Sequence, residues 1–160
     1  MKTYNAPWGK TLVWVSILFT VFCGGASGVT VVLVHDITGP AWVAGAWLPV
    51  LLMAGCLPFV VRSYAITEDA ILIRRLWWTT RLDRMTLKSA EVVPDAMRGS
   101  IRTCGNGGGF SITGWYWSKR LGAYRAFVTD LNRTVVLRLG KRTVVLSPDE
   151  PAEFVRELGF

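Results

Sequence analysis

The fold is decided by the stretch TLVWVSILFTVFCGGASGVTVVLV (residues 11–34), which carries no charged side chain. A second stretch of this kind, ITGPAWVAGAWLPVLLMAGCLPFVV (37–61), follows after His35 and Asp36. About 20 apolar residues are enough for a helix to cross a hydrocarbon core roughly 30 Å thick. The two stretches therefore predict a hairpin of two transmembrane helices, which forms the first domain, residues 1–61, together with a short N-terminal tail.

Residues 62–160 carry most of the charge. All but two of the 18 Lys and Arg residues lie there, and so do all but one of the 11 Asp and Glu residues. A segment of this length can bury one small core, so we expect a single soluble domain at 62–160. Its excess of Lys and Arg over Asp and Glu suits a position next to an anionic membrane leaflet, beside the membrane helices. Nucleic acid is not expected as a partner, because no run of basic residues exceeds two.

The short flanks of the helices predict their orientation. Lys2 and Lys10 precede the first helix and Arg62 follows the second, whereas the connecting turn at Asp36 to Pro40 has no Lys or Arg. Basic flanks stay on the cytoplasmic side of a membrane. We therefore expect a multi-pass protein of the plasma membrane with both termini in the cytoplasm and the turn outside.

Small residues in the first helix could mediate helix contacts. Gly24 and Gly28 form a GxxxG spacing, which allows two helix backbones to approach closely. Glycine is also simply common in membrane helices. Packing within the hairpin and dimerisation between two copies of the chain are the other interpretations.

The remaining residues predict a mainly-β domain. Short segments rich in β-branched and aromatic residues predict strands at 63–67, 70–75, 76–82, 90–93, 124–129, 134–139 and 142–146. A short helix follows, with Ser147 or Asp149 as its cap and Pro151 in its first turn. Phe154, Val155 and Leu158 form its apolar face. We expect a strongly bent sheet or barrel covered by this helix.

A glycine-rich segment, Cys104 to Phe110, superficially resembles a phosphate-binding loop. Such loops need a preceding strand, a following helix and usually a Lys in register. Phe110 is instead followed by SITG, which does not start a helix. We expect Gly105–Gly109 to be a flexible connecting loop with positive-φ turns.

Two aromatic and basic clusters form a candidate contact surface. One lies at residues 115–120 and the other at residues 77–81. Such a cluster suits the headgroup layer of a membrane, because the aromatic rings can lie at the boundary with the acyl chains while the cations contact lipid phosphates. The rings could also fill the domain core or a partner interface. The candidate contact residues are Trp77, Trp78, Arg81, Trp115, Tyr116, Trp117, Lys119 and Arg120.

Catalysis is not expected. The single histidine, His35, lies in the predicted external turn, so it cannot pair with Cys104 in the soluble domain. A His-based metal cluster would need a second histidine. We predict no catalytic residue, no metal site and no cofactor, and we expect Cys23, Cys56 and Cys104 to be reduced and unpaired.

Three parts of the soluble segment resemble the bacterial pleckstrin-homology-like (bacterial PH) domain family. They are YAIT (64–67) through RRLWWTT (74–80), DAMRGS (95–100) through the glycine loop to YRAFVTD (124–130), and VVLSPD (144–149). Two membrane helices before the domain are also similar to the usual layout of that family.

The resemblance implies a PH-like fold, a seven-stranded, barrel-like bent sheet capped by a C-terminal helix. It implies no particular function, because fold and function separate easily. Eukaryotic pleckstrin domains bind phosphoinositides with an early basic cluster. Arg74, Arg75 and Arg81 lie near an analogous place, but no motif carries that site over.

These features predict a non-catalytic, membrane-anchored binding or scaffolding module at the cytoplasmic face of a bacterial plasma membrane. Beyond the lipids around its helices, we expect a protein partner or a second copy of the chain. The alternative is a sensor of anionic lipid headgroups. Headgroup binding should weaken steeply with ionic strength, whereas docking of a protein partner should persist.

Overall fold

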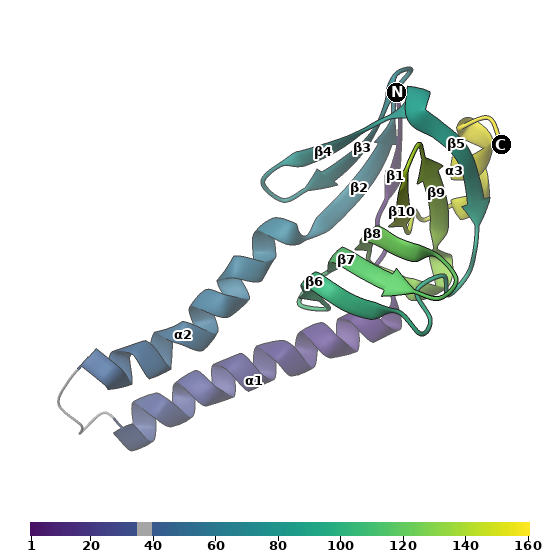
Figure 1. Cartoon of the computed structure of the whole chain (residues 1–160). Coiled ribbons are helices and arrows are strands. Elements are labelled where there is room, and N and C mark those ends of the chain that lie inside the picture. Colours follow the sequence, from purple (N-terminus) through teal and green to yellow (C-terminus); the bar gives the residue numbers. More distant parts are fainter. Residues whose placement is uncertain (35–39) are drawn as a thin grey trace.

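The computed structural model describes residues 1–34 and 40–160, and it places a β domain at one end of two long helices (Figure 1). The helices are α1 (Lys10–Val34) and α2 (Pro40–Cys56), and the 3₁₀ turn η1 (Leu57–Phe59) continues α2 into the domain. The expected turn between the helices, with His35 and Asp36, lies outside the described residues.

Both helices are long and apolar enough to cross a membrane. At a rise of 1.5 Å per residue, the 25 residues of α1 extend about 37 Å. Large apolar side chains such as Phe22, Leu33 and Leu51 are exposed along them. Gly45 meets the Thr30 side chain, but among the described residues nothing lies within 4 Å of a Cβ built on Gly24 or Gly28. The GxxxG pair therefore does not pack against α2.

The domain contains two sheets. Sheet A has the order β1-β2-β3-β4, and sheet B has the order β5-β9-β10-β8-β7-β6. The strands are β1 (Lys2–Asn5), β2 (Val61–Ile66), β3 (Ala70–Arg75), β4 (Thr79–Asp83), β5 (Leu87–Val92), β6 (Ile101–Gly107), β7 (Ile112–Ser118), β8 (Gly122–Val128), β9 (Val135–Leu139) and β10 (Arg142–Leu146). The 3₁₀ turns η2 (Arg84–Thr86) and η3 (Leu131–Arg133) follow β4 and β8. Neighbouring strands run antiparallel except β8 and β10, which are parallel.

The PH-like architecture is confirmed as a mainly-β domain with a C-terminal helix, and three details differ from expectation. The described residues after α2 form nine strands rather than seven, and the two sheets stay separate instead of closing into a barrel. Residues 2–5, expected as a tail, pair with β2 as the edge strand β1. The chain on both sides of the helical hairpin thus belongs to one sheet.

The main core lies between the sheets and is closed by α3 (Pro151–Glu157). Phe154 of α3 is fully buried and packs edge-to-face against Tyr4 of β1 at 5.1 Å. The expected side-chain cap of α3 is absent from the described structure. Glu150 occupies the N-cap without a capping hydrogen bond, and Asp149 accepts one from the Glu150 amide instead.

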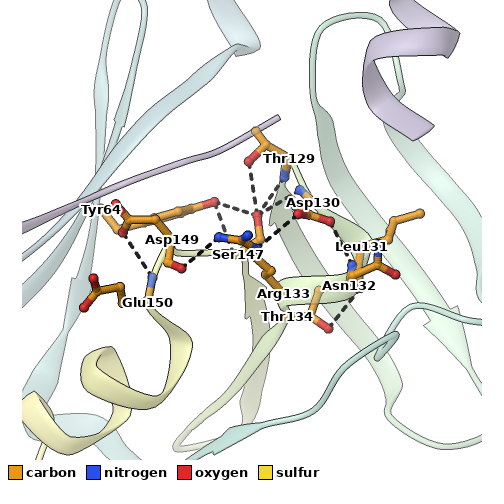
Figure 2. A network of polar contacts seen from close by, with 10 residues as sticks. All are labelled: Tyr64, Thr129, Asp130, Leu131, Asn132, Arg133, Thr134, Ser147, Asp149 and Glu150. Carbon is orange, nitrogen blue, oxygen red and sulfur yellow. Dashed lines mark hydrogen bonds and ion pairs between the residues drawn. The ribbon is translucent and has the colours of Figure 1, made fainter. Parts of the chain in front are cut away.

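Ser147, an expected cap, is buried at the centre of a polar network (Figure 2). Its hydroxyl accepts hydrogen bonds from the amides of Thr129 (2.8 Å) and Asp130 (3.2 Å), and its own amide donates to the Tyr64 hydroxyl (3.3 Å). Burial raises the pKa of Tyr64 to about 12. This network connects the ends of β8 and β10 to β2. The segment just before α1 is attached at the same place, because the amide of Gly9 donates to the Thr129 carbonyl.

The turn between β6 and β7 lies between the domain-facing ends of the helices. In Figure 1 α1 and α2 diverge toward the domain, and the β6–β7 end lies in the opening. The Ser16 hydroxyl of α1 donates to the Gly108 carbonyl (3.3 Å) and accepts from the Phe110 amide (3.1 Å). These bonds connect the first turns of α1 to sheet B.

A candidate anion site between the sheets

The first aromatic cluster lies beside the end of α2. Trp77 and Trp78 occupy the β3–β4 turn, and Trp77 is 74% exposed. Trp78 packs edge-to-face against Phe59 of η1, with ring centroids 5.3 Å apart. Two exposed rings therefore lie where the chain leaves α2 and enters sheet A.

The second cluster is divided between two faces of β7. Side chains alternate along a strand, so Trp115 and Trp117 are exposed while Tyr116 is buried on the opposite face. Tyr116 stacks on Tyr124, its hydroxyl donates to the Asn106 carbonyl, and burial raises its pKa. Tyr116 is thus a core residue and does not belong to the exposed surface.

The basic candidates do not gather around the tryptophans. Arg81 on β4 forms an ion pair with Asp69 in the β2–β3 turn. Lys119 and Arg120 are exposed in the β7–β8 turn. The contact surface expected from the sequence is therefore dispersed.

Other arginines connect the two tryptophan clusters. The Arg75 guanidinium of β3 lies 5.3 Å from the Trp78 ring and 4.7 Å from the Phe127 ring. The Arg125 guanidinium of β8 lies 4.9 Å from the same Phe127 ring and 5.7 Å from the Trp115 ring. Rings and guanidinium groups thus alternate from sheet A to sheet B. Each such cation–π contact contributes about 0.5–2 kcal/mol.

A cavity of about 510 Å³ lies beside these arginines and is lined by residues of both helices. We call it the arginine cavity, because Arg75, Arg102 and Arg125 line it and no Asp or Glu does so in the described part of the chain. The remaining lining combines apolar side chains of α1, α2, η1 and β8 with the β6–β7 hairpin, which contributes glycines and the polar residues Asn106 and Thr113. The apolar residues and glycines include Val15, Phe19, Cys56, Phe59, Phe127, Gly105, Gly107, Gly108, Gly109 and Gly114.

Two buried polar atoms of the cavity wall have no partner among the described residues. They are the Arg75 Nε and the Thr113 Oγ1. The two residues are only 8% and 3% exposed. Burial, followed by the nearby charge of Arg125, lowers the pKa of Arg75 to about 10. Unpartnered buried polar groups are rare in native structures and call for an explanation.

The family model described as a bacterial PH domain matches residues 62–159, which is more than half of the chain. The chain belongs to the bacterial PH domain family. No curated protein and no solved structure matches it. Membership of this family suggests a binding module, and the domain is attached to two helices that are long and apolar enough to cross a membrane.

The three cavity arginines of this bacterial PH domain were not among the predicted site residues. The strand pattern could have indicated Arg125. It lies two residues before the buried Phe127 and therefore shares its face of β8, which places a charge on a face that points into the core. Arg75 was considered only together with Arg74 and Arg81. The structure separates them, because Arg75 is buried while Arg81 is exposed and paired.

Proposed function

We propose that this bacterial PH domain is a membrane-anchored binding module that contacts lipid headgroups at the cytoplasmic face of a bacterial plasma membrane. In this proposal α1 and α2 span the bilayer, and residues 62–160 form the cytoplasmic domain. The exposed apolar side chains along both helices support it, because water would disfavour so continuous an apolar surface. The basic flanks Lys10 and Arg62 support the orientation.

The pairing of β1 with β2 constrains the topology. β1 precedes the first helix and β2 follows the second, and they pair from Lys2 with Ile66 to Asn5 with Ser63. Strands on opposite sides of a membrane cannot pair. Any membrane arrangement with this sheet therefore places both ends of the hairpin on one side, as two spans require.

The observation that carries the headgroup role is the exposure of Trp77 beside the end of α2. Indole rings favour the interface between acyl chains and headgroups. Because Trp78 contacts Phe59 of η1, the β3–β4 turn is held next to the point where α2 would leave the bilayer. A domain attached in this way presents its aromatic turn to the headgroup layer.

A protein partner is the second candidate, and the edge of sheet B supports it. β6 pairs only with β7 in the described structure, and Ile101 on it is 64% exposed. An open edge strand can accept an added strand from a partner. Such binding depends on backbone hydrogen bonds and hydrophobic pockets, so it should be insensitive to salt.

Topology is tested with Cys104, which is exposed on β6. In a Cys23→Ala/Cys56→Ala background, an impermeant maleimide should label Cys104 in permeabilised cells and leave it unlabelled in intact cells. Labelling in intact cells would place the domain outside and overturn the proposed orientation.

Headgroup contact is tested with an environment-sensitive probe at position 77. The full chain, carrying Trp77→Cys and no other cysteine, is reconstituted in nanodiscs that contain an anionic lipid. The probe emission should shift to the blue, and salt should reduce the shift. The matched control is Met85→Cys, because Met85 is also highly exposed but lies in the β4–β5 connection, away from the helices (Figure 1). Equal shifts at both positions would contradict the proposal.

A further inference from the structure

We propose that the arginine cavity is a binding site for the phosphate headgroup of an anionic glycerophospholipid, which enters between the domain-facing ends of α1 and α2. This inference deepens the proposed function and rests on it in one respect. The helices must place the cavity mouth at the level of the lipid headgroups.

The charge of the cavity favours an anion. Arg75, Arg102 and Arg125 line one space with no carboxylate of the described chain among them. Burying a cation without a counter-ion is costly, and Arg75 is 8% exposed. An anionic ligand would supply the missing charge. Guanidinium groups suit a phosphate in particular, because their planar donors match two phosphate oxygens at once.

The unpartnered atoms of the wall point to the same ligand. The Arg75 Nε carries a proton that it can only donate, and the Thr113 hydroxyl can donate as well. Both residues line the cavity, and both atoms are buried and lack a partner within residues 1–34 and 40–160. A phosphate offers several acceptor oxygens for donors of this kind.

The apolar half of the cavity distinguishes a lipid from free phosphate. Val15 and Phe19 of α1 and Phe59 of η1 form walls with which inorganic phosphate has no favourable contact. A glycerol backbone and the start of an acyl chain would cover these side chains. The volume of about 510 Å³ also lies within the usual range for sites that bind small organic ligands.

The test uses the full chain purified in a mild neutral detergent. Phosphatidylglycerol or phosphatidylcholine is titrated in mixed micelles, and the bound lipid is counted by native mass spectrometry. We expect phosphatidylglycerol to bind at least about tenfold more tightly. Arg75→Gln and Arg125→Gln should each weaken it by about tenfold or more, since each removes a charge-assisted hydrogen bond. Arg81→Gln is the matched control, because Arg81 pairs with Asp69 outside the cavity.

Three results would overturn the inference. They are equal binding of the two lipids, unchanged phosphatidylglycerol binding by the arginine variants, and full competition by inorganic phosphate at equal concentration, which would identify a site for the free anion. Arg102→Gln removes a more exposed cavity arginine, so it reports on the site even if Arg75→Gln fails to fold. Because topology and probe position are measured separately at Cys104 and position 77, a failure of lipid selectivity is distinguishable from a failure of the proposed function.

Discussion

A single residue, Arg75, illustrates a conflict between stability and the binding that we propose. Its guanidinium lies over the rings of Trp78 and Phe127 and forms no ion pair within the described residues. The stacked rings compensate only part of the lost hydration of the charge. The unliganded protein should therefore be less stable with Arg75 than with an apolar residue at this position.

Arg75→Met should raise the Tm of the lipid-free protein by roughly 5 °C, as expected for a gain of about 1 kcal/mol in a domain of this size. Thermal unfolding followed by tryptophan fluorescence measures it. Arg81→Met serves as the control and should change the Tm little, because exposed ion pairs contribute about 0–1 kcal/mol. A lower Tm for Arg75→Met would show that the buried charge is compensated within the protein.

Tyr64 predicts a loss of stability at alkaline pH. Its pKa is about 12 in the folded protein and lies near 10 in the unfolded chain. Between these values the folded state retains a proton that the unfolded state has released, so the free energy of unfolding falls as the pH rises. The contribution is complete below pH 10 and is lost by about pH 12. Tyr64→Phe should flatten this part of a stability–pH profile, and an unchanged slope would contradict the assignment.

At the level of elements, the β6–β7 hairpin depends on a pair of glycines. Gly105 and Gly114 face each other across the strands and have φ values of +120° and +142°. A Cβ on Gly114 would lie 2.8 Å from the Gly105 Cα and would collide with the Cys104 carbonyl oxygen. The two strands can approach this closely only because neither residue has a side chain.

Gly114→Ala should therefore lower the Tm by on the order of 10 °C or more, a loss of about 2–4 kcal/mol. Gly122→Ala is a matched control, because Gly122 also has a positive φ, +69°, but its Cβ position is open. The control should show only the backbone strain, roughly 1–2 kcal/mol. Equal losses in the two variants would mean that the close strand approach is not required.

Elements with regular patterns were predicted well. β3 and β10 have the predicted bounds, because both are rich in β-branched residues and end at clear turns. β6 and β7 were missed. The glycines of β6 have low strand propensity, and the positive φ of Gly105 is stabilised by pairing with β7 rather than by local sequence. The expected flexible loop is thus reduced to the turn after Gly107.

The candidate site was only partly visible in the sequence. Trp77 and Trp115 were candidate contact residues and are exposed, whereas the candidate Tyr116 is buried. The cavity arginines come from β3, β6 and β8, and only the packing of sheet A near sheet B brings Arg75 close to Arg125. A strand pattern can indicate an inward-facing charge, but it does not indicate which other charge it will meet.

For the whole molecule, the decisive contact is the one that attaches the helices to the domain. Ser16 of α1 bonds to Gly108 and Phe110 in the β6–β7 turn. Gly109 lies beside the side chains of Cys56 and Phe19, so this turn contacts both helices at once. The β6–β7 hairpin therefore fixes the direction in which the domain projects from the two helices.

Ser16→Ala should release this turn. The Phe110 amide loses its acceptor, so its hydrogen exchange in the reconstituted protein should accelerate by about 5–30-fold, the equivalent of 1–2 kcal/mol. Thr20→Val is the control, because the Thr20 hydroxyl donates to the Ser16 carbonyl within α1 and, in the described part of the chain, to no group of the β6–β7 turn. If Phe110 exchanged at the wild-type rate in Ser16→Ala, the helix contact would not hold the turn.

The pairing of β1 with β2 has a consequence for how the chain is made. β1 leaves the ribosome before either helix, but its partner is synthesised only after both helices. In a chain inserted as proposed, β1 waits in the cytosol until the translocon has released the complete hairpin. A chain whose second helix fails to insert leaves the two strands on opposite sides of the membrane. Sheet A then lacks its edge strand β1. A complete sheet A therefore indicates that both helices have been inserted correctly.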